Sequence, residues 1–175
     1  ISYLCKIAEP THGLITNIAP AHLEGFGTIE EITKEKGELF QFLSDGYSFV
    51  NQADSKIKEL PVPGNKITFG LTPDCDFPAD IYEEKDGTLT LLINTEEVQT
   101  QSYNLSFAKN ILAAAAISLT MKIDMETFQE RILSFEPPKS RCEVKHFGNI
   151  TVIDDTYNAN LESTIASIDY LNALS

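Results

Sequence analysis

The 175-residue chain is poor in positive charge, with 13 Lys and Arg residues against 26 Asp and Glu residues and a formal net charge of −13. A surface of that sign argues against nucleic acid and against an anionic membrane as partners. It does not exclude a nucleotide, which needs only local cations and a metal ion. The sequence also lacks a signal peptide and any apolar run long enough to cross a bilayer, so we expect no membrane insertion.

Cysteine is scarce as well. Cys5, Cys75 and Cys142 are an odd set without the spacing of a metal site, which favours reduced thiols in a cytoplasmic protein. No G-x-x-x-x-G-K-[ST] motif is present, so this stretch of sequence contains no phosphate-binding loop of that type. Because the chain begins at Ile1, within a helical pattern, we expect it to be a fragment of a longer protein.

Strand and helix patterns alternate along most of the chain. Short apolar runs predict strands at 13–19, 47–51 and 66–70, with helical patterns beginning near Thr28 and Ser106. This alternation predicts βαβ units and a mostly parallel sheet with flanking helices, an α/β fold.

The segment from 79 to 103 has a different pattern. Two strand-like runs, 80–83 and 88–93, flank Asp86-Gly87, a signal for a hairpin with a primed turn. A further strand pattern follows at 97–102. We therefore expect a small antiparallel sheet appended to the parallel one.

Pro137-Pro138 interrupts the pattern, because two prolines cannot continue a helix. We expect a hinge that divides the chain into residues 1–136 and residues 139–175. The second part has a hairpin pattern and then a helical one, and at about 37 residues it is too short for a free-standing domain. An apolar stripe on that last helix consists of Ile165, Ile168 and Leu171. We expect this stripe to face inward.

The stretch from 13 to 40 combines a strand pattern, a loop and a capped helix. Thr28 and Glu31 have the spacing of a capping box, in which each side chain bonds to the backbone of the other residue. Lys36 falls on the apolar stripe of the helix that follows. A lysine there either extends along the core to reach water or has a chemical function on the inner face.

His22 and Glu24 stand in the loop after the strand, where open α/β sheets bind ligands. An ammonium group cannot ligate a metal ion, because it has no free lone pair. A Lys36 that has captured carbon dioxide would be a carbamate, an anionic oxygen donor similar to Glu. A structural histidine and a lysine that reaches water are the alternative for these residues.

The sequence TNIAPAHLEGFG (16–27), followed by KEKGELF (34–40), resembles the central-domain signature of the Mur ligases. Within that family it is most similar to the MurF type, which adds D-alanyl-D-alanine to UDP-muramyl tripeptide. The resemblance implies that His22 binds magnesium and that a carbamylated Lys36 lies beside the same ion. Glu24 is a further candidate ligand.

A second motif, DDTYNANL (154–161), resembles the DDxYNANP motif of the MurF type, with Leu161 in place of proline. The resemblance implies that Asp155 binds the ATP ribose and that Tyr157 and Asn158 face the nucleotide or the incoming amine. Without the resemblance, a helix cap with solvated acids would be the better explanation of these residues.

Two further residues match the family less fully. Arg141 resembles the arginine of a GR motif that contacts the nucleotide phosphates, although Ser140 replaces the glycine. Asn110 resembles the asparagine that reads adenine at the start of an Ala-rich helix, although Ser106 and Phe107 interrupt the usual lead-in.

Taken together, the resemblance implies a partial Mur-ligase central domain without its phosphate loop (1–136), followed by the start of the C-terminal α/β domain (139–175). The parent protein would be a cytoplasmic, monomeric, ATP- and Mg²⁺-dependent acid–amino-acid ligase of peptidoglycan synthesis, with roles in cell shape and division. It would join D-Ala-D-Ala to UDP-MurNAc-tripeptide through an acyl phosphate. Two alternatives remain open. One is another ligase of the superfamily (a different Mur ligase, or a folylpolyglutamate or cyanophycin synthetase type), and the other is a non-catalytic nucleotide-binding module.

Because the phosphate loop is missing, the chain by itself should show no ligase activity and at best very weak ATP binding. Calorimetric titration with ATP tests this. An affinity in the micromolar range for these residues alone would contradict the prediction and indicate a second nucleotide site.

Overall fold

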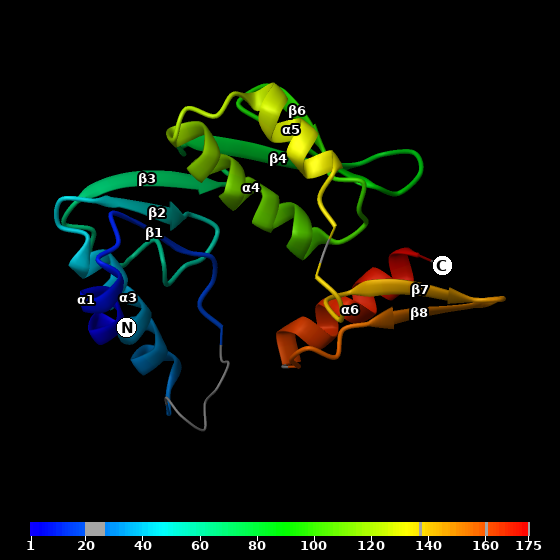
Figure 1. The fold of residues 1–175 in the computed structure, drawn as a ribbon, viewed down its shortest axis with the longest axis horizontal. Coiled ribbons are helices and arrows are strands. Elements are labelled where there is room, and N and C mark those ends of the chain that lie inside the picture. The colour runs from blue at the N-terminus through cyan, green and yellow to red at the C-terminus, as the bar shows by residue number, and fades with distance from the viewer. Residues whose placement is uncertain (20–26, 137, 160, 175) are drawn as a thin grey trace.

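The computed structural model describes residues 1–19, 27–136, 138–159 and 161–174. It is a mixed α/β structure in which one six-stranded sheet and its helices are followed by a two-stranded sheet with one helix (Figure 1). Within the described part of the chain, no helix is both long enough and apolar enough to cross a membrane.

The large sheet has the strand order β1-β2-β3-β4-β5-β6, and its first four strands are parallel. These strands are β1 (His12–Ile15), β2 (Tyr47–Asn51), β3 (Asn65–Gly70) and β4 (Phe77–Glu83). β1 pairs with β2 in the register Leu14 to Phe49. The carboxyl ends of these parallel strands lie at one edge of the sheet, where the predicted ligand loop begins.

The antiparallel part continues the same sheet. β4 pairs with β5 (Leu89–Ile93), and β5 pairs with β6 (Glu96–Gln99). The predicted mostly parallel sheet with an appended antiparallel portion is therefore confirmed. The turn between β4 and β5 differs from the prediction, because only Gly87 has a positive φ, of 86°. A type I′ turn needs positive φ at both central residues.

Among the described residues, four helices accompany this sheet: α1 (Ser2–Ala8), α3 (Ile29–Phe42), α4 (Leu105–Thr120) and α5 (Met125–Leu133). The capping box predicted at the start of α3 is present, with the Thr28 side chain accepting from the Glu31 amide and the Glu31 carboxylate accepting from the Thr28 amide. Asp124 directly precedes the helical pattern over 125–135, which predicts a cap, and its side chain caps α5 by accepting from the Thr127 amide. A short helix is also expected over 54–60, but the structure forms consecutive turns there.

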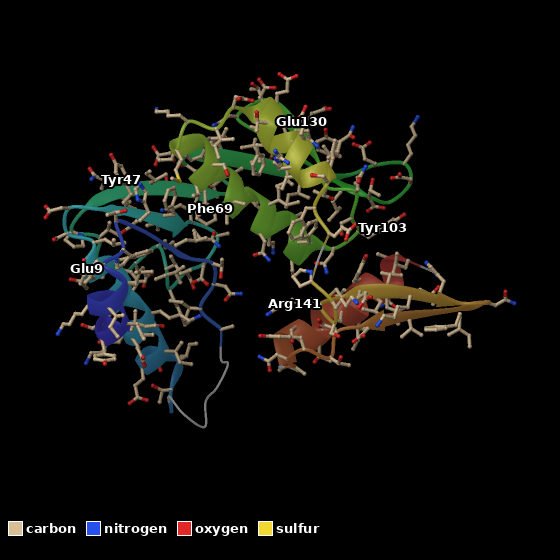
Figure 2. The ribbon with its side chains drawn as sticks, viewed as in Figure 1. Glu9, Tyr47, Phe69, Tyr103, Glu130 and Arg141 are labelled. Carbon is tan, nitrogen blue, oxygen red and sulfur yellow. The ribbon has the colours of Figure 1, made fainter. Side chains whose placement is uncertain are left out.

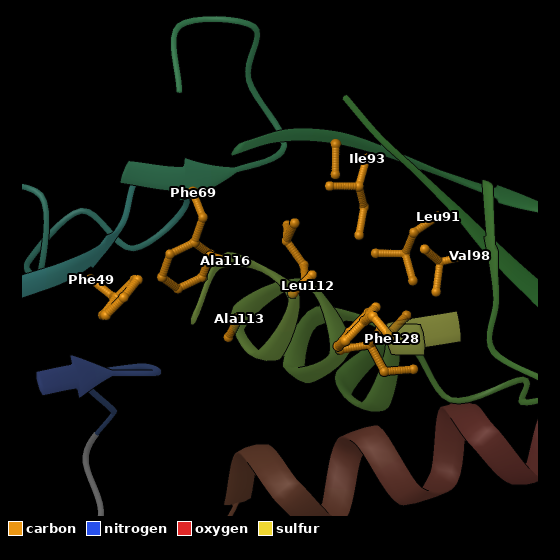
Figure 3. Close-up of a cluster of buried hydrophobic side chains, with 13 residues drawn as sticks. Phe49, Phe69, Leu91, Ile93, Val98, Leu112, Ala113, Ala116 and Phe128 are labelled. Atoms are coloured by element: carbon orange, nitrogen blue, oxygen red, sulfur yellow. The ribbon is translucent and has the colours of Figure 1, made fainter. Parts of the chain in front are cut away.

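The core has two parts because the sheet is covered on both faces. Phe49 and Phe69 point toward α4, whose small buried residues, such as Ala113 and Ala116, permit close packing (Figure 3). Val50, the neighbour of Phe49, faces the other side and packs in the cluster beneath α3. Opposite faces for consecutive residues follow from the two-residue period of a strand.

The remaining elements are β7 (Glu143–Phe147), β8 (Ile150–Asp154) and α6 (Leu161–Ala173). β7 and β8 pair with each other in a separate two-stranded sheet. The division into parts 1–136 and 139–175 stays a prediction, and Pro137 lies outside the described residues.

The expected inward stripe of α6 is wrong. Ile165, Ile168 and Leu171 are 49%, 54% and 43% exposed, respectively. Helical spacing places residues on one face, but it does not supply the element that covers that face.

Candidate functional site

A cavity of about 590 Å³ lies between the large sheet with α4 and the C-terminal hairpin with α6. Six of the residues proposed from the sequence line it: Lys36, Asn110, Arg141, Asp155, Tyr157 and Asn158. The first and the last of them, Lys36 and Asn158, are more than a hundred residues apart in the sequence. Figure 2 shows Arg141 below the first turn of α4, and residues of that turn line the same cavity.

Lys36 reaches the cavity from the middle of α3. It is half-buried, and its Nζ donates a hydrogen bond to the backbone carbonyl of Asn17, 2.9 Å away. Asn17 and Ala19 line the same wall. The amino group therefore lies at the edge of the apolar stripe, directed toward the segment that follows β1.

Arg141 is held against an aromatic ring. Its guanidinium carbon lies 3.9 Å from the centre of the Tyr157 ring, a cation–π arrangement. The Tyr157 amide also donates to the Ser140 carbonyl over 3.1 Å. Ser140 and Cys142, on either side of the arginine, have positive φ values of 60° and 51°. The left-handed conformation at Ser140 is one that glycine adopts at little cost and that other residues adopt rarely.

Asp155 is half-buried and bonds to two neighbouring elements. One carboxylate oxygen accepts from the Cys142 amide over 3.1 Å, and the other accepts from the Ser167 hydroxyl over 2.6 Å. The carboxylate thereby joins the start of β7 to α6. Its remaining lone pairs are available to a ligand in the cavity.

Asp154, next to Asp155, forms the shorter of the two ion pairs that the structure describes in the hairpin. Lys145 Nζ lies 2.5 Å from one of its oxygens, and the Thr156 hydroxyl donates to the other over 2.7 Å. The hydrogen bond from Lys145 has the larger effect and that from Thr156 the next, and together they lower the pKa of Asp154 to about 2.

The low pKa of Asp154 leads to a prediction about acid stability. Because the pKa is lower in the folded chain than its ordinary value, the contribution to stability is complete above about pH 4 and is lost as the pH falls through about 2. We expect Asp154→Asn to lower stability at neutral pH and to flatten its decline between these two values. Denaturant unfolding at a series of pH values measures this, with the exposed Asp169→Asn as control. If the free energy of unfolding fell equally steeply with pH in the original chain and in Asp154→Asn, the prediction would be contradicted.

The first turn of α4 adds residues that the sequence analysis did not place in a site. Asn104 caps the helix through the Phe107 amide and lines the cavity. Phe107 stacks on Phe135, with ring centres 5.7 Å apart, and both rings line the cavity too. The signal for Asn104 was its position just before an apolar helix. Nothing in the sequence pairs Phe107 with Phe135.

The predicted metal ligands His22 and Glu24 lie outside the described residues. Among the residues that the structure does describe, no group of three or more His, Cys, Asp or Glu side chains could hold a metal ion.

Residues 2–118 match a family model described as the Mur ligase middle domain. Among curated proteins, a UDP-N-acetylmuramoyl-tripeptide–D-alanyl-D-alanine ligase of Haemophilus influenzae is 29% identical over 177 residues, a match that covers 98% of this chain and 39% of that protein. The ligase of the same name from Synechocystis is 31% identical over 176 residues, covering 98% of this chain and 37% of the relative. The chain thus spans less than half the length of these relatives.

Solved structures give the same result. The fold matches MurF from Acinetobacter baumannii with a TM-score of 0.86 and 26% identity, covering 98% of this chain and 39% of that one. It also matches the MurF ligase from Thermotoga maritima in complex with ADP. The TM-score is 0.83 at 27% identity, and the match covers 99% of this chain and 42% of that one.

Proposed function

This chain belongs to the Mur ligase family, whose middle domain it carries, and on that premise we propose that it forms part of the ATP site of a D-Ala-D-Ala-adding ligase. The proposed enzyme acts in the cytoplasm as a monomer and joins the dipeptide to UDP-MurNAc-tripeptide through an acyl phosphate. We use the name full-length ligase for a protein of the relatives' length that contains this chain.

One observation carries the proposal. The cavity of about 590 Å³ gathers Lys36 and Asn110 from the large sheet's helices and Arg141 and Asp155 from the C-terminal part. Its size is within the usual range for small-ligand and cofactor sites. The ADP complex of a relative whose fold this chain shares supports assigning the cavity to a nucleotide.

In this proposal each residue has a role suited to its chemistry. Arg141 holds the phosphates, because a guanidinium binds phosphate oxygens through two parallel N–H groups. Asp155 accepts from a ribose hydroxyl. Asn110, whose amide both donates and accepts, reads the adenine edge. Tyr157 supports Arg141 from beneath, and Asn158 faces the incoming amine.

Magnesium, when bound, would offset negative charge on the transferring phosphoryl group. The described residues alone do not provide a full ligand set, so the proposal assigns the ion to His22 and a carbamylated Lys36, with Glu24 as a further candidate. The contact of Lys36 is compatible with the modification, because a carbamate nitrogen keeps one hydrogen with which to donate to Asn17. Its carboxylate group would then extend into the cavity.

The test is a ligase assay with the full-length ligase, ATP, Mg²⁺, UDP-MurNAc-tripeptide and D-Ala-D-Ala. We expect phosphate release and a product whose mass equals the sum of the two substrates minus one water. Omission of either UDP-MurNAc-tripeptide or D-Ala-D-Ala should prevent product formation. If other amine substrates gave product and D-Ala-D-Ala gave none, the protein would be a different ligase of the superfamily.

Two departures from the family pattern favour a second candidate, a non-catalytic nucleotide-binding module. Ser140 replaces a glycine and adopts a positive φ, and Phe107 stands where the lead-in to the adenine-reading residue is usually polar. ATP binding without any product would support this candidate over the ligase.

A further inference from the structure

Three side chains hold consecutive backbone groups of the segment that follows β1. Asn51 Nδ2 donates to the Thr16 carbonyl over 2.8 Å, and Asp54 Oδ2 accepts from the Ile18 amide over 2.8 Å. Between them, the Asn17 carbonyl accepts from Lys36 Nζ over 2.9 Å. Asn51 ends β2, and Asp54 stands in the turn after it.

The carboxylate of Asp54 is fully engaged in this arrangement. Its Oδ1 accepts from the Lys56 and Ile57 amides over 2.9 and 3.0 Å, which shapes its own turn, and its Oδ2 accepts from Ile18. Ile18 and Ile57 are both buried in the core beneath α3, at 7% and 0% exposure. The acceptor is therefore anchored at the core, and so is the amide that it holds.

Asn51 is engaged in the same way, since its Oδ1 accepts from the Ala53 amide over 2.9 Å while its Nδ2 binds Thr16. Neither Asn51 nor Asp54 lines the cavity that holds Lys36; both line a neighbouring cavity of about 310 Å³. The two cavities share Asn17 in their walls, and Asn51 and Asp54 bond to the backbone on both sides of it, at Thr16 and Ile18.

We propose that Asn51 and Asp54 are positioning residues for Lys36. By fixing the backbone on both sides of Asn17, they hold its carbonyl in the one place where it can accept from Lys36 Nζ and so direct the lysine along the cavity wall. The sheet explains why they can do so: β1 and β2 are parallel neighbours, and their carboxyl ends lie side by side. This inference rests on the proposed function, because it assigns Lys36 a role in the ligase reaction.

The experiment uses two isosteric variants of the full-length ligase. In Asp54→Asn, we expect the side-chain oxygen to keep accepting from the Lys56 and Ile57 amides. The side-chain NH₂ group then faces the Ile18 amide, so that two hydrogen-bond donors meet and the bond to Ile18 is lost. In Asn51→Asp, the bond from Ala53 is kept, and a carboxylate oxygen faces the Thr16 carbonyl, opposing acceptor to acceptor. One variant removes a negative charge and the other adds one. An electrostatic effect on the cavity would therefore have opposite signs, whereas loss of positioning has the same sign in both.

We expect each variant to lower kcat by about 10–100-fold, the range found when groups that orient a catalytic or metal-binding side chain are lost. The KM for ATP should stay within about twofold of its original value. Two measurements made without substrate accompany the kinetics. Hydrogen exchange at the Ile18 amide should become faster. Acylation of Lys36 by an N-hydroxysuccinimide ester, measured by mass spectrometry in bicarbonate-free buffer so that Lys36 is the free amine, should become severalfold faster. Asp124→Asn is the matched control, because asparagine caps α5 as well as aspartate does and the charge change equals that of Asp54→Asn.

Opposite changes of kcat in the two variants, or an unchanged kcat with faster exchange at Ile18, would overturn the positioning role. If the exchange rate at the Ile18 amide and the acylation rate of Lys36 were both unchanged, Asn51 and Asp54 would not be holding the backbone beside Lys36. A full-length ligase without any activity would disprove the proposed function, and the exchange and acylation rates would still decide whether Asn51 and Asp54 hold Lys36. If Asp54→Asn does not fold, Asn51→Asp gives the same three measurements.

Discussion

Lys36→Ala is expected to lower kcat of the full-length ligase by at least about 10²–10³-fold, the loss that follows removal of one group that stabilises charge in a transition state. The fold should remain intact, because Lys36 is only half-buried and water can replace its hydrogen bond to the Asn17 carbonyl, the one that it forms with the residues the structure describes. The measurement is kcat at saturating substrates, together with the thermal unfolding midpoint.

Chemical rescue distinguishes the two interpretations of Lys36, a carbamylated catalytic lysine and a lysine that extends to water. If a carbamate is the active form, acetate or formate should partly restore activity to Lys36→Ala by placing a carboxylate in the vacated space. Lys36→Arg should not be rescued, because its permanent positive charge fills the space and repels magnesium. A lysine that merely extends to water predicts the reverse, with Lys36→Arg nearly as active as the original enzyme. Lys34→Ala, an exposed position on the same helix, serves as control.

Arg141→Ala should have the second large effect, a fall in kcat of about 10² or more, because a cation on the transferring phosphates stabilises charge that develops during the reaction. Tyr157→Ala should lower kcat by only about two- to fivefold. That range corresponds to about 0.5–1 kcal/mol for a cation–π contact at an exposed site. Arg141 lies 3.9 Å above the Tyr157 ring, and Tyr157 is 67% exposed.

Tyr157→Phe is the matched control for this pair. Phenylalanine keeps the ring face under the guanidinium and removes the hydroxyl alone, so we expect kcat close to that of the original enzyme. If the Tyr157 hydroxyl instead contacted the nucleotide or the amine, Tyr157→Phe would be as impaired as Tyr157→Ala. That result would contradict the supporting role and restore the one implied by the sequence resemblance.

The local signals of the sequence were sufficient for most of the elements. The capping box of Thr28 and Glu31, the cap at Asp124 and the Gly148-Asn149 hairpin act between residues a few positions apart, and all three are present. The change from parallel to antiparallel pairing was also predictable at its two clearest points, because helix α3 connects the parallel strands β1 and β2 and a short turn connects the antiparallel strands β4 and β5. Such signals are readable because their physical causes are local.

Contacts between distant segments could be read only from the tertiary structure. Periodicity placed Lys36 on the inner face of α3, but only the arrangement of β1 beside that helix shows that its amine meets the Asn17 carbonyl. Similarly, nothing near Arg141 in the sequence indicates that its guanidinium rests on the ring of Tyr157, sixteen residues later.

The sequence by itself therefore determined the type and order of the elements and, through its motifs, the residues worth testing. The tertiary structure decided which of those residues share one cavity, that Asp54 and Asn51 hold the backbone beside Lys36, and that the apolar stripe of α6 is exposed. The physical reason is that propensity and periodicity act over a few residues, whereas a cavity and a buried face are formed by segments that the chain brings together only when it folds.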